Sequence, residues 1–107
     1  MRNQETNIMN KYLLHFSGVG AMVWRNNTGK FRSLTDPQRI VTVGQVGSAD
    51  IIGVQPVTIT ADMVGKVIGQ AIAIEVKTPT GKQSQEQKNW QQAFEKHGGI
   101  YILGRGL

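Results

Sequence analysis

The most constraining feature of the sequence is an alternating segment, residues 70–77, that is followed by a helical pattern and by a second β segment. β-Branched residues at every second position of residues 70–77 predict a strand. Residues 83–96 have helical spacing, two glycines follow them, and residues 100–103 form the last apolar run. A crossover of this length joins parallel strands, so we predict a right-handed strand–helix–strand unit and an α/β fold. The helix residues expected to face the sheet are Trp90, Ala93 and Phe94.

The first two-thirds of the chain predict one more helix and three more strands. Residues 3–17 have an apolar stripe at helical spacing, and Gly18 and Gly20 end it. Strands are predicted at residues 21–25, 39–43 and 49–54, the last two joined as a hairpin through residues 44–47, while residues 30–39 are predicted to be a loop. Residues 60–64 predict one capped helical turn. The expected organisation is a single domain spanning residues 1–107.

Composition limits the chemistry that this chain can perform. Cysteine is absent and there are two histidines, so thiolate zinc sites and Cys nucleophiles are excluded and any metal must be held by oxygen ligands. Twelve Lys and Arg against seven Asp and Glu give a net charge of +5, which favours nucleic acid as a partner. No apolar run approaches the ~20 residues that span a bilayer, and no signal peptide is recognised, so we expect a cytoplasmic protein.

Three residues stand out as candidates for chemistry. Asp50 opens an apolar strand, and Glu75 and Lys77 share one face of another strand beside small alanines. Carboxylates bind divalent cations, such a cation polarises a phosphodiester, and a nearby lysine offsets the charge that develops on phosphorus. The structural alternative is a solvated Glu–Lys pair and an aspartate that serves a turn.

Four segments together resemble a VRR-NUC domain: residues 47–53 (GSADIIG), 73–78 (AIEVKT), 81–87 (GKQSQEQ) and 98–101 (GGIY). That family belongs to the PD-(D/E)XK nucleases, which have the restriction-endonuclease-like fold. The resemblance covers nearly the whole chain, which has the size of the stand-alone viral (phage) and bacterial members. It implies an αβββαβ order with a central mixed sheet flanked by helices.

The resemblance also assigns roles to individual residues. It implies that Asp50 and Glu75 bind Mg²⁺ or Mn²⁺, together with the backbone carbonyl of Val76, and that Lys77 is the catalytic lysine. Gln87 matches the glutamine of the helix that follows the catalytic strand, although its spacing from Ser84 is also that of a capping box.

Two further points concern the acidic ligands. Glu5 is the only acid available on the first helix, where the family often supplies another ligand. A first-turn glutamate also stabilises a helix through its dipole, so this alternative stays open. Where the superfamily has proline before the aspartate, this chain has Ala49.

DNA contacts are expected from a basic and amide-rich part of the chain around residues 24–32. Packing of a hairpin with solvated charges is the alternative for the same residues. The predicted DNA-binding residues are Arg25, Asn27, Lys30, Arg32 and Lys82.

We therefore expect a metal-dependent endodeoxyribonuclease. The resemblance implies a homodimer that acts on branched DNA such as a four-way (Holliday) junction, without a membrane partner or nucleotide cofactor. Two alternatives are a non-catalytic nucleic-acid-binding module on a nuclease-like fold, and a structural or regulatory protein whose basic charge aids solubility.

Overall fold

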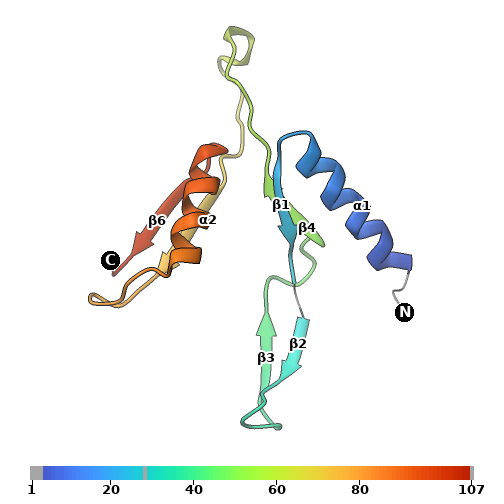
Figure 1. The fold of residues 1–107 in the computed structure, drawn as a ribbon, viewed down its shortest axis with the longest axis vertical. Helices are drawn as coiled ribbons and strands as arrows, with labels where there is room; N and C mark the ends of the chain where they lie inside the picture. The colour runs from blue at the N-terminus through green and yellow to red at the C-terminus, as the bar shows by residue number, and fades with distance from the viewer. Residues whose placement is uncertain (1–3, 28, 107) are drawn as a thin grey trace.

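The computed structural model describes residues 4–27 and 29–106, which form two helices, a 3-10 turn and six short strands (Figure 1). The predicted start of the first helix at Asn3 lies outside the described residues. The helices are α1 (Gln4–Gly18) and α2 (Gln85–Lys96), and the 3-10 turn is η1 (Ala61–Met63). The strands are β1 (Met22–Arg25), β2 (Gly29–Arg32), β3 (Ile40–Val43), β4 (Ile51–Val54), β5 (Ile72–Val76) and β6 (Ile100–Gly104).

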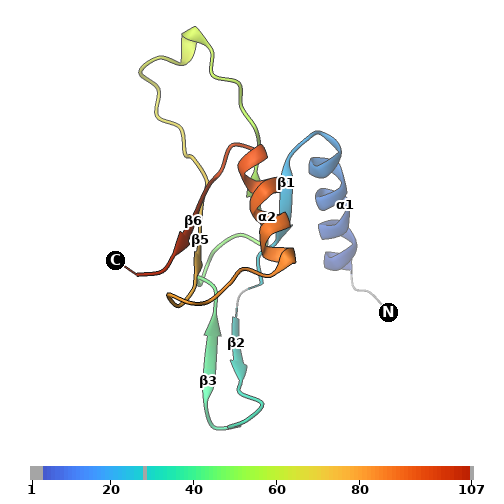
Figure 2. The same ribbon diagram turned by 60° about the vertical axis from the view of Figure 1, so that its left-hand side comes forward.

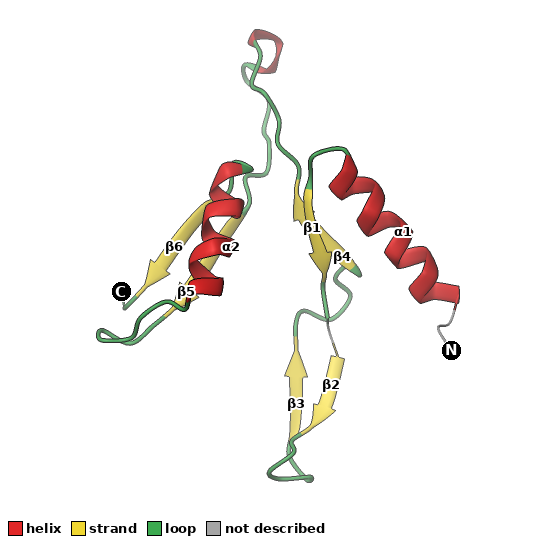
Figure 3. Ribbon diagram, viewed as in Figure 1, coloured by secondary structure: helices red, strands yellow, loops and turns green. Residues whose placement is uncertain are grey.

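The described strands form three two-stranded sheets, coloured yellow in Figure 3. β1 pairs antiparallel with β4, β2 pairs antiparallel with β3, and β5 pairs parallel with β6. The α/β composition is confirmed. The single mixed sheet of an αβββαβ core is not confirmed by the described residues, since no ladder joins β4 to β5.

The predicted hairpin between residues 39–43 and 49–54 is wrong. β3 pairs with β2, a strand formed within the segment that we expected to be a loop, because Phe31 alternates with two basic residues and fits a ladder. β4 pairs instead with β1, and Gly53 permits their close approach, since a Cβ at this position would clash with the carbonyl oxygen of Met22.

The parallel strand–helix–strand unit is confirmed. Ile72 lies opposite Ile100 and Glu75 lies opposite Leu103 in the β5–β6 ladder. α2 packs against this pair through Phe94, which is 2% exposed and whose ring occupies the space that a side chain at position 99 would need. Glycine at position 99 is therefore required by the packing of α2.

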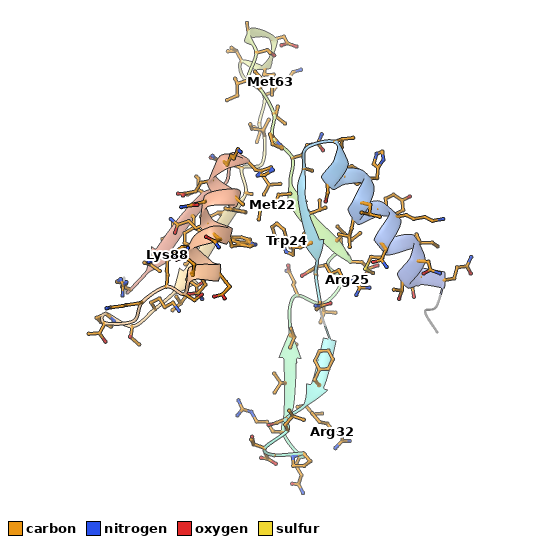
Figure 4. The ribbon with its side chains drawn as sticks, in the orientation of Figure 1. Met22, Trp24, Arg25, Arg32, Met63 and Lys88 are labelled. Atoms are coloured by element: carbon orange, nitrogen blue, oxygen red, sulfur yellow. The ribbon has the colours of Figure 1, made fainter. Side chains whose placement is uncertain are left out.

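An aromatic cluster links α2 to the first half of the chain. The Trp90 ring stacks on Phe94 with centroids 4.7 Å apart and lies 6.1 Å from Tyr101. Trp24 points from β1 toward α2 (Figure 4), and its ring meets Trp90 edge-on at 5.5 Å. This cluster places the β1–β4 pair beside the β5–β6 unit.

The covered face of β5 is the polar one. Ala73, Glu75 and Lys77 are half-buried, whereas Ile72 and Ile74 are 60% and 59% exposed. A strand at a protein surface ordinarily buries its β-branched side chains and exposes its charged ones. The structure therefore brings Glu75 beside α2 and leaves an apolar sheet face open.

α1 lies along β1 on the side away from α2, and only part of its predicted apolar stripe is covered. Met9 and Leu13 are half-buried, while Ile8 and Tyr12 are 47% and 55% exposed. Neither helix in the described ranges combines the length and the hydropathy that a membrane span requires.

Candidate functional site

Asp50 lies at the start of β4, in a loop that is held by Asn26. The backbone N–H of Asn26 donates to the carbonyl oxygen of Asp50 at 2.8 Å. The Asn26 side-chain amide donates to the hydroxyl of Ser48 at 2.7 Å and to the carbonyl oxygen of Ala49 at 2.9 Å. Asn26 thus fixes the approach to Asp50, a role that sequence reasoning missed. The pocket at Asp50 is lined by Met9, Arg25, Asn26, Asn27, Phe31 and Asp50.

Glu75 lies on the half-buried face of β5, at one end of a hydrogen-bond chain. The Tyr101 hydroxyl donates to Oε1 of Glu75 at 3.5 Å. The Gln83 side-chain amide donates to the Tyr101 oxygen at 3.2 Å and to Oε1 of Gln91 at 2.9 Å. The chain therefore connects the loop before α2, α2 itself and β6 to the Glu75 carboxylate.

Gln87 caps α2 and also lines a pocket at Glu75. Its side-chain oxygen accepts from the backbone N–H of Ser84 at 2.9 Å, while its backbone N–H donates to the Ser84 hydroxyl at 3.1 Å. This is the capping box that the spacing allowed. The pocket is lined by Glu75, Glu86, Gln87, Trp90 and Tyr101, so a catalytic role for Gln87 stays a prediction beside its structural one.

Lys77 directly follows β5, and its backbone N–H donates to the carbonyl oxygen of Gly104 at 2.9 Å. The turn that carries the chain from Lys77 to Lys82 is held by Arg105. Its guanidinium donates to the carbonyl oxygens of Thr78, Pro79 and Gly81 at 2.8, 3.3 and 2.7 Å. Lys77 is half-buried and Lys82 is exposed. Arg105 is a second residue that sequence reasoning missed.

The Asp50 and Glu75 carboxylates lie in different parts of the candidate site. Asp50 and Glu75 line different pockets, and no group of three or more acidic or histidine side chains occurs in the described part of the chain. β4 runs into the loop of residues 55–71 and β5 runs out of it (Figure 1), so Asp50 before β4 and Glu75 near the end of β5 both lie at the ends remote from that loop. A shared ion stays a prediction.

Glu5 and Val76 complete the expected ligand set. Glu5 is exposed in the first turn of α1, one helical turn before Met9, which lines the Asp50 pocket. The Val76 side chain is 76% exposed on the opposite face of β5 from Glu75, so only its backbone carbonyl is suited to the role. Both assignments stay predictions.

The predicted DNA-binding residues extend from the Asp50 pocket along the β2–β3 hairpin. Arg25 and Asn27 line that pocket, and the Arg25 Nε donates to the Met9 sulfur at 2.9 Å. Lys30 and Arg32 are exposed on β2, which projects from the rest of the chain with Arg32 near its tip (Figure 4). The Arg32 guanidinium donates to the carbonyl oxygen of Pro37 at 3.1 Å, which orients it on the hairpin.

The donor chemistry fits a hard divalent cation. Carboxylate and carbonyl oxygens suit Mg²⁺ and Mn²⁺. The predicted ligand set of two carboxylates and a carbonyl would suit Mg²⁺, which keeps several waters and takes further oxygens from a phosphate substrate. A cluster of three acids is therefore not required for such an ion.

The comparison with protein families gives a match that covers nearly the whole chain. The sequence model of the VRR-NUC domain matches residues 6–106, which include the Asp50 loop, β5 and α2. Comparisons with curated proteins and with solved structures gave no match. Because the matched region spans nearly the whole chain, this protein belongs to the VRR-NUC domain family of nucleases.

Proposed function

We propose that this protein is a Mg²⁺- or Mn²⁺-dependent endonuclease that hydrolyses phosphodiester bonds in DNA. The observation that carries the proposal is the half-buried Glu75–Lys77 pair. A family match over residues 6–106 supports it, and so does the position of the pair on the face of β5 that a strand ordinarily fills with apolar side chains. Partial burial of the Glu75 and Lys77 charges lowers the stability of the fold, and a catalytic role is a reason for the chain to keep them there.

The roles of the side chains follow from their chemistry. Asp50 and Glu75 supply carboxylate oxygens for the ion, with the Val76 carbonyl and Glu5 as further ligands. When bound, a divalent cation polarises the scissile phosphate and makes water a stronger nucleophile. The Lys77 ammonium orients the attacking water and stabilises the negative charge that builds on the phosphate oxygens. The Tyr101 hydroxyl donates a hydrogen bond to the Glu75 carboxylate, and Gln87 lines the pocket beside it.

The substrate is double-stranded DNA with branches, and the active form is a homodimer. A single small domain carries one site, whereas two copies related by a twofold axis carry one site for each of two strands. The residues that contact phosphates are Arg25, Asn27, Lys30, Arg32 and Lys82, since no element typical of base reading occurs in residues 4–27 and 29–106.

Cleavage of labelled duplex, nicked and four-way DNA with Mn²⁺ tests the proposal. Asp50→Asn, Glu75→Gln and Lys77→Ala should each reduce cutting by about a hundredfold or more while DNA affinity changes little. Glu95→Gln and Lys96→Ala remove equivalent charges from the exposed end of α2 and should cut like the wild type. EDTA should abolish cutting by every protein.

The non-catalytic module is the second candidate, favoured by the separation of Asp50 and Glu75 into different pockets. It predicts DNA binding that falls with salt and no cutting of any of these substrates. A wild type that binds but never cuts would replace the nuclease proposal with this one. Cutting that survives Glu75→Gln would remove Glu75 from the proposed site.

A further inference from the structure

Residues 55–69, here named the projecting segment, leave the end of β4 and return to β5 as an open loop (Figures 1 and 2). Met63 in η1 marks its tip (Figure 4). The predicted turn at residues 60–64 is present as η1, although the Thr60 hydroxyl bonds the Asp62 carboxylate and not the backbone. The exposed apolar side chains of the segment are Val57 (60%), Ile59 (75%), Val64 (85%), Val67 (99%) and Ile68 (53%).

The charge of the projecting segment fits a protein partner and not a nucleic acid. It carries one acid, Asp62, and one base, Lys66, in a chain whose net charge is +5. Two copies of this chain repel each other through their basic surfaces, and a neutral apolar segment is where that repulsion is weakest. Its residues before η1 are extended and pair with no described strand, so their backbone groups are also open to another chain.

The chain exposes more surface than a compact domain of its length. Its radius of gyration is 17.4 Å, whereas a compact domain of this length has about 13 Å. Its accessible surface is 9012 Å², whereas a folded monomer of this mass exposes about 5,900 Å². Obligate homodimers bury about 2,000–5,000 Å² counted over both chains, so the difference of roughly 3,000 Å² per chain exceeds one such interface, and covering the projecting segment would account for part of it.

We propose that the projecting segment is the self-association surface of this protein, and that its partner is the same segment of a second copy. The segment lies at the opposite end of the chain from the β2–β3 hairpin and from the ends of β4 and β5 that carry Asp50 and Glu75 (Figure 1). Contact through it leaves both sites and both basic hairpins open to DNA. The inference rests on the homodimer of the proposed function and names its interface.

Charge insertion at fully exposed positions tests this interface. Val67→Glu and Val64→Lys place a charge at positions that are 99% and 85% exposed in the single chain, so neither should disturb the fold of one copy. Leu34→Glu is the matched control, because Leu34 is also fully exposed but lies in the turn of the β2–β3 hairpin. Light scattering after size exclusion gives the mass, and circular dichroism checks folding.

The wild type and Leu34→Glu should have the mass of a dimer. Val67→Glu and Val64→Lys should have the mass of a monomer, with a circular dichroism spectrum like that of the wild type. A monomeric wild type, or a dimer that persists in both variants, overturns the interface. These measurements use no DNA and no metal. A dimer that cuts nothing therefore refutes the nuclease and keeps the interface, while a cutting monomer does the reverse.

Discussion

Tyr101 shows what a single residue contributes to this site. Its hydroxyl lies between Glu75 and Gln83 and is the only link in the described hydrogen-bond chain that touches the carboxylate. In the parallel ladder Tyr101 lies opposite Ala73, one same-face position before Glu75. The parallel pairing of these strands was predicted, and with its register the diagonal position of Tyr101 and Glu75 follows. The sequence does not specify the register, which shifts by a few angstroms from one alternative to the next.

Tyr101→Phe should weaken Mn²⁺ binding about threefold to tenfold, the net worth of one hydrogen bond that orients the carboxylate. The fold should be retained, because the ring that contacts Trp90 stays in place. Calorimetric titration of the metal without DNA measures the change. Tyr12→Phe, on the exposed side of α1, removes the same atom elsewhere and should bind Mn²⁺ like the wild type. Equal affinities in all three proteins would contradict the positioning role of Tyr101.

At the scale of elements, patterns within one segment were reliable, whereas the predicted pairings between segments were right for β5 with β6 and wrong for β3 with β4. α2 ends at Lys96 before two glycines, as its local residues predicted, but it begins at Gln85 after its Ser84 cap and not at Gln83. The β3–β4 hairpin was wrong because β2, which lies in the segment expected to be a loop, pairs with β3; the backbone N–H of Ser33 donates to the carbonyl oxygen of Arg39 and closes the loop of residues 33–39 between them. Local spacing does not rank such alternatives.

The β2–β3 hairpin makes an element-scale prediction. Lys30→Ala and Arg32→Ala should each lower DNA affinity and reduce the slope of log affinity against log salt by about one, since each loses one phosphate contact. Fluorescence anisotropy in EDTA measures binding without cutting. Lys66→Ala removes a lysine from the projecting segment and should leave the slope unchanged. If all three variants bind alike, the hairpin does not contact DNA.

The whole molecule is more open than its composition indicated. The described apolar residues that are buried are Ala21, Val54 and Phe94, and the open face of β5 adds to the apolar surface of the projecting segment. A sequence pattern shows which residues are apolar, but not whether their partner lies in the same chain or in a second copy. For that reason the site residues named from the sequence stay predictions, and the separation of Asp50 and Glu75 into different pockets was not foreseeable.

The central claim is that Asp50 and Glu75 hold one divalent cation. The most direct test is anomalous diffraction at the manganese edge from crystals of the wild-type protein soaked in Mn²⁺, beside Glu75→Gln crystals treated identically. The account predicts an anomalous peak in contact with both carboxylates in the wild type and its loss in the variant. A wild-type crystal with no peak there, or with manganese bound only to other residues, would contradict the account.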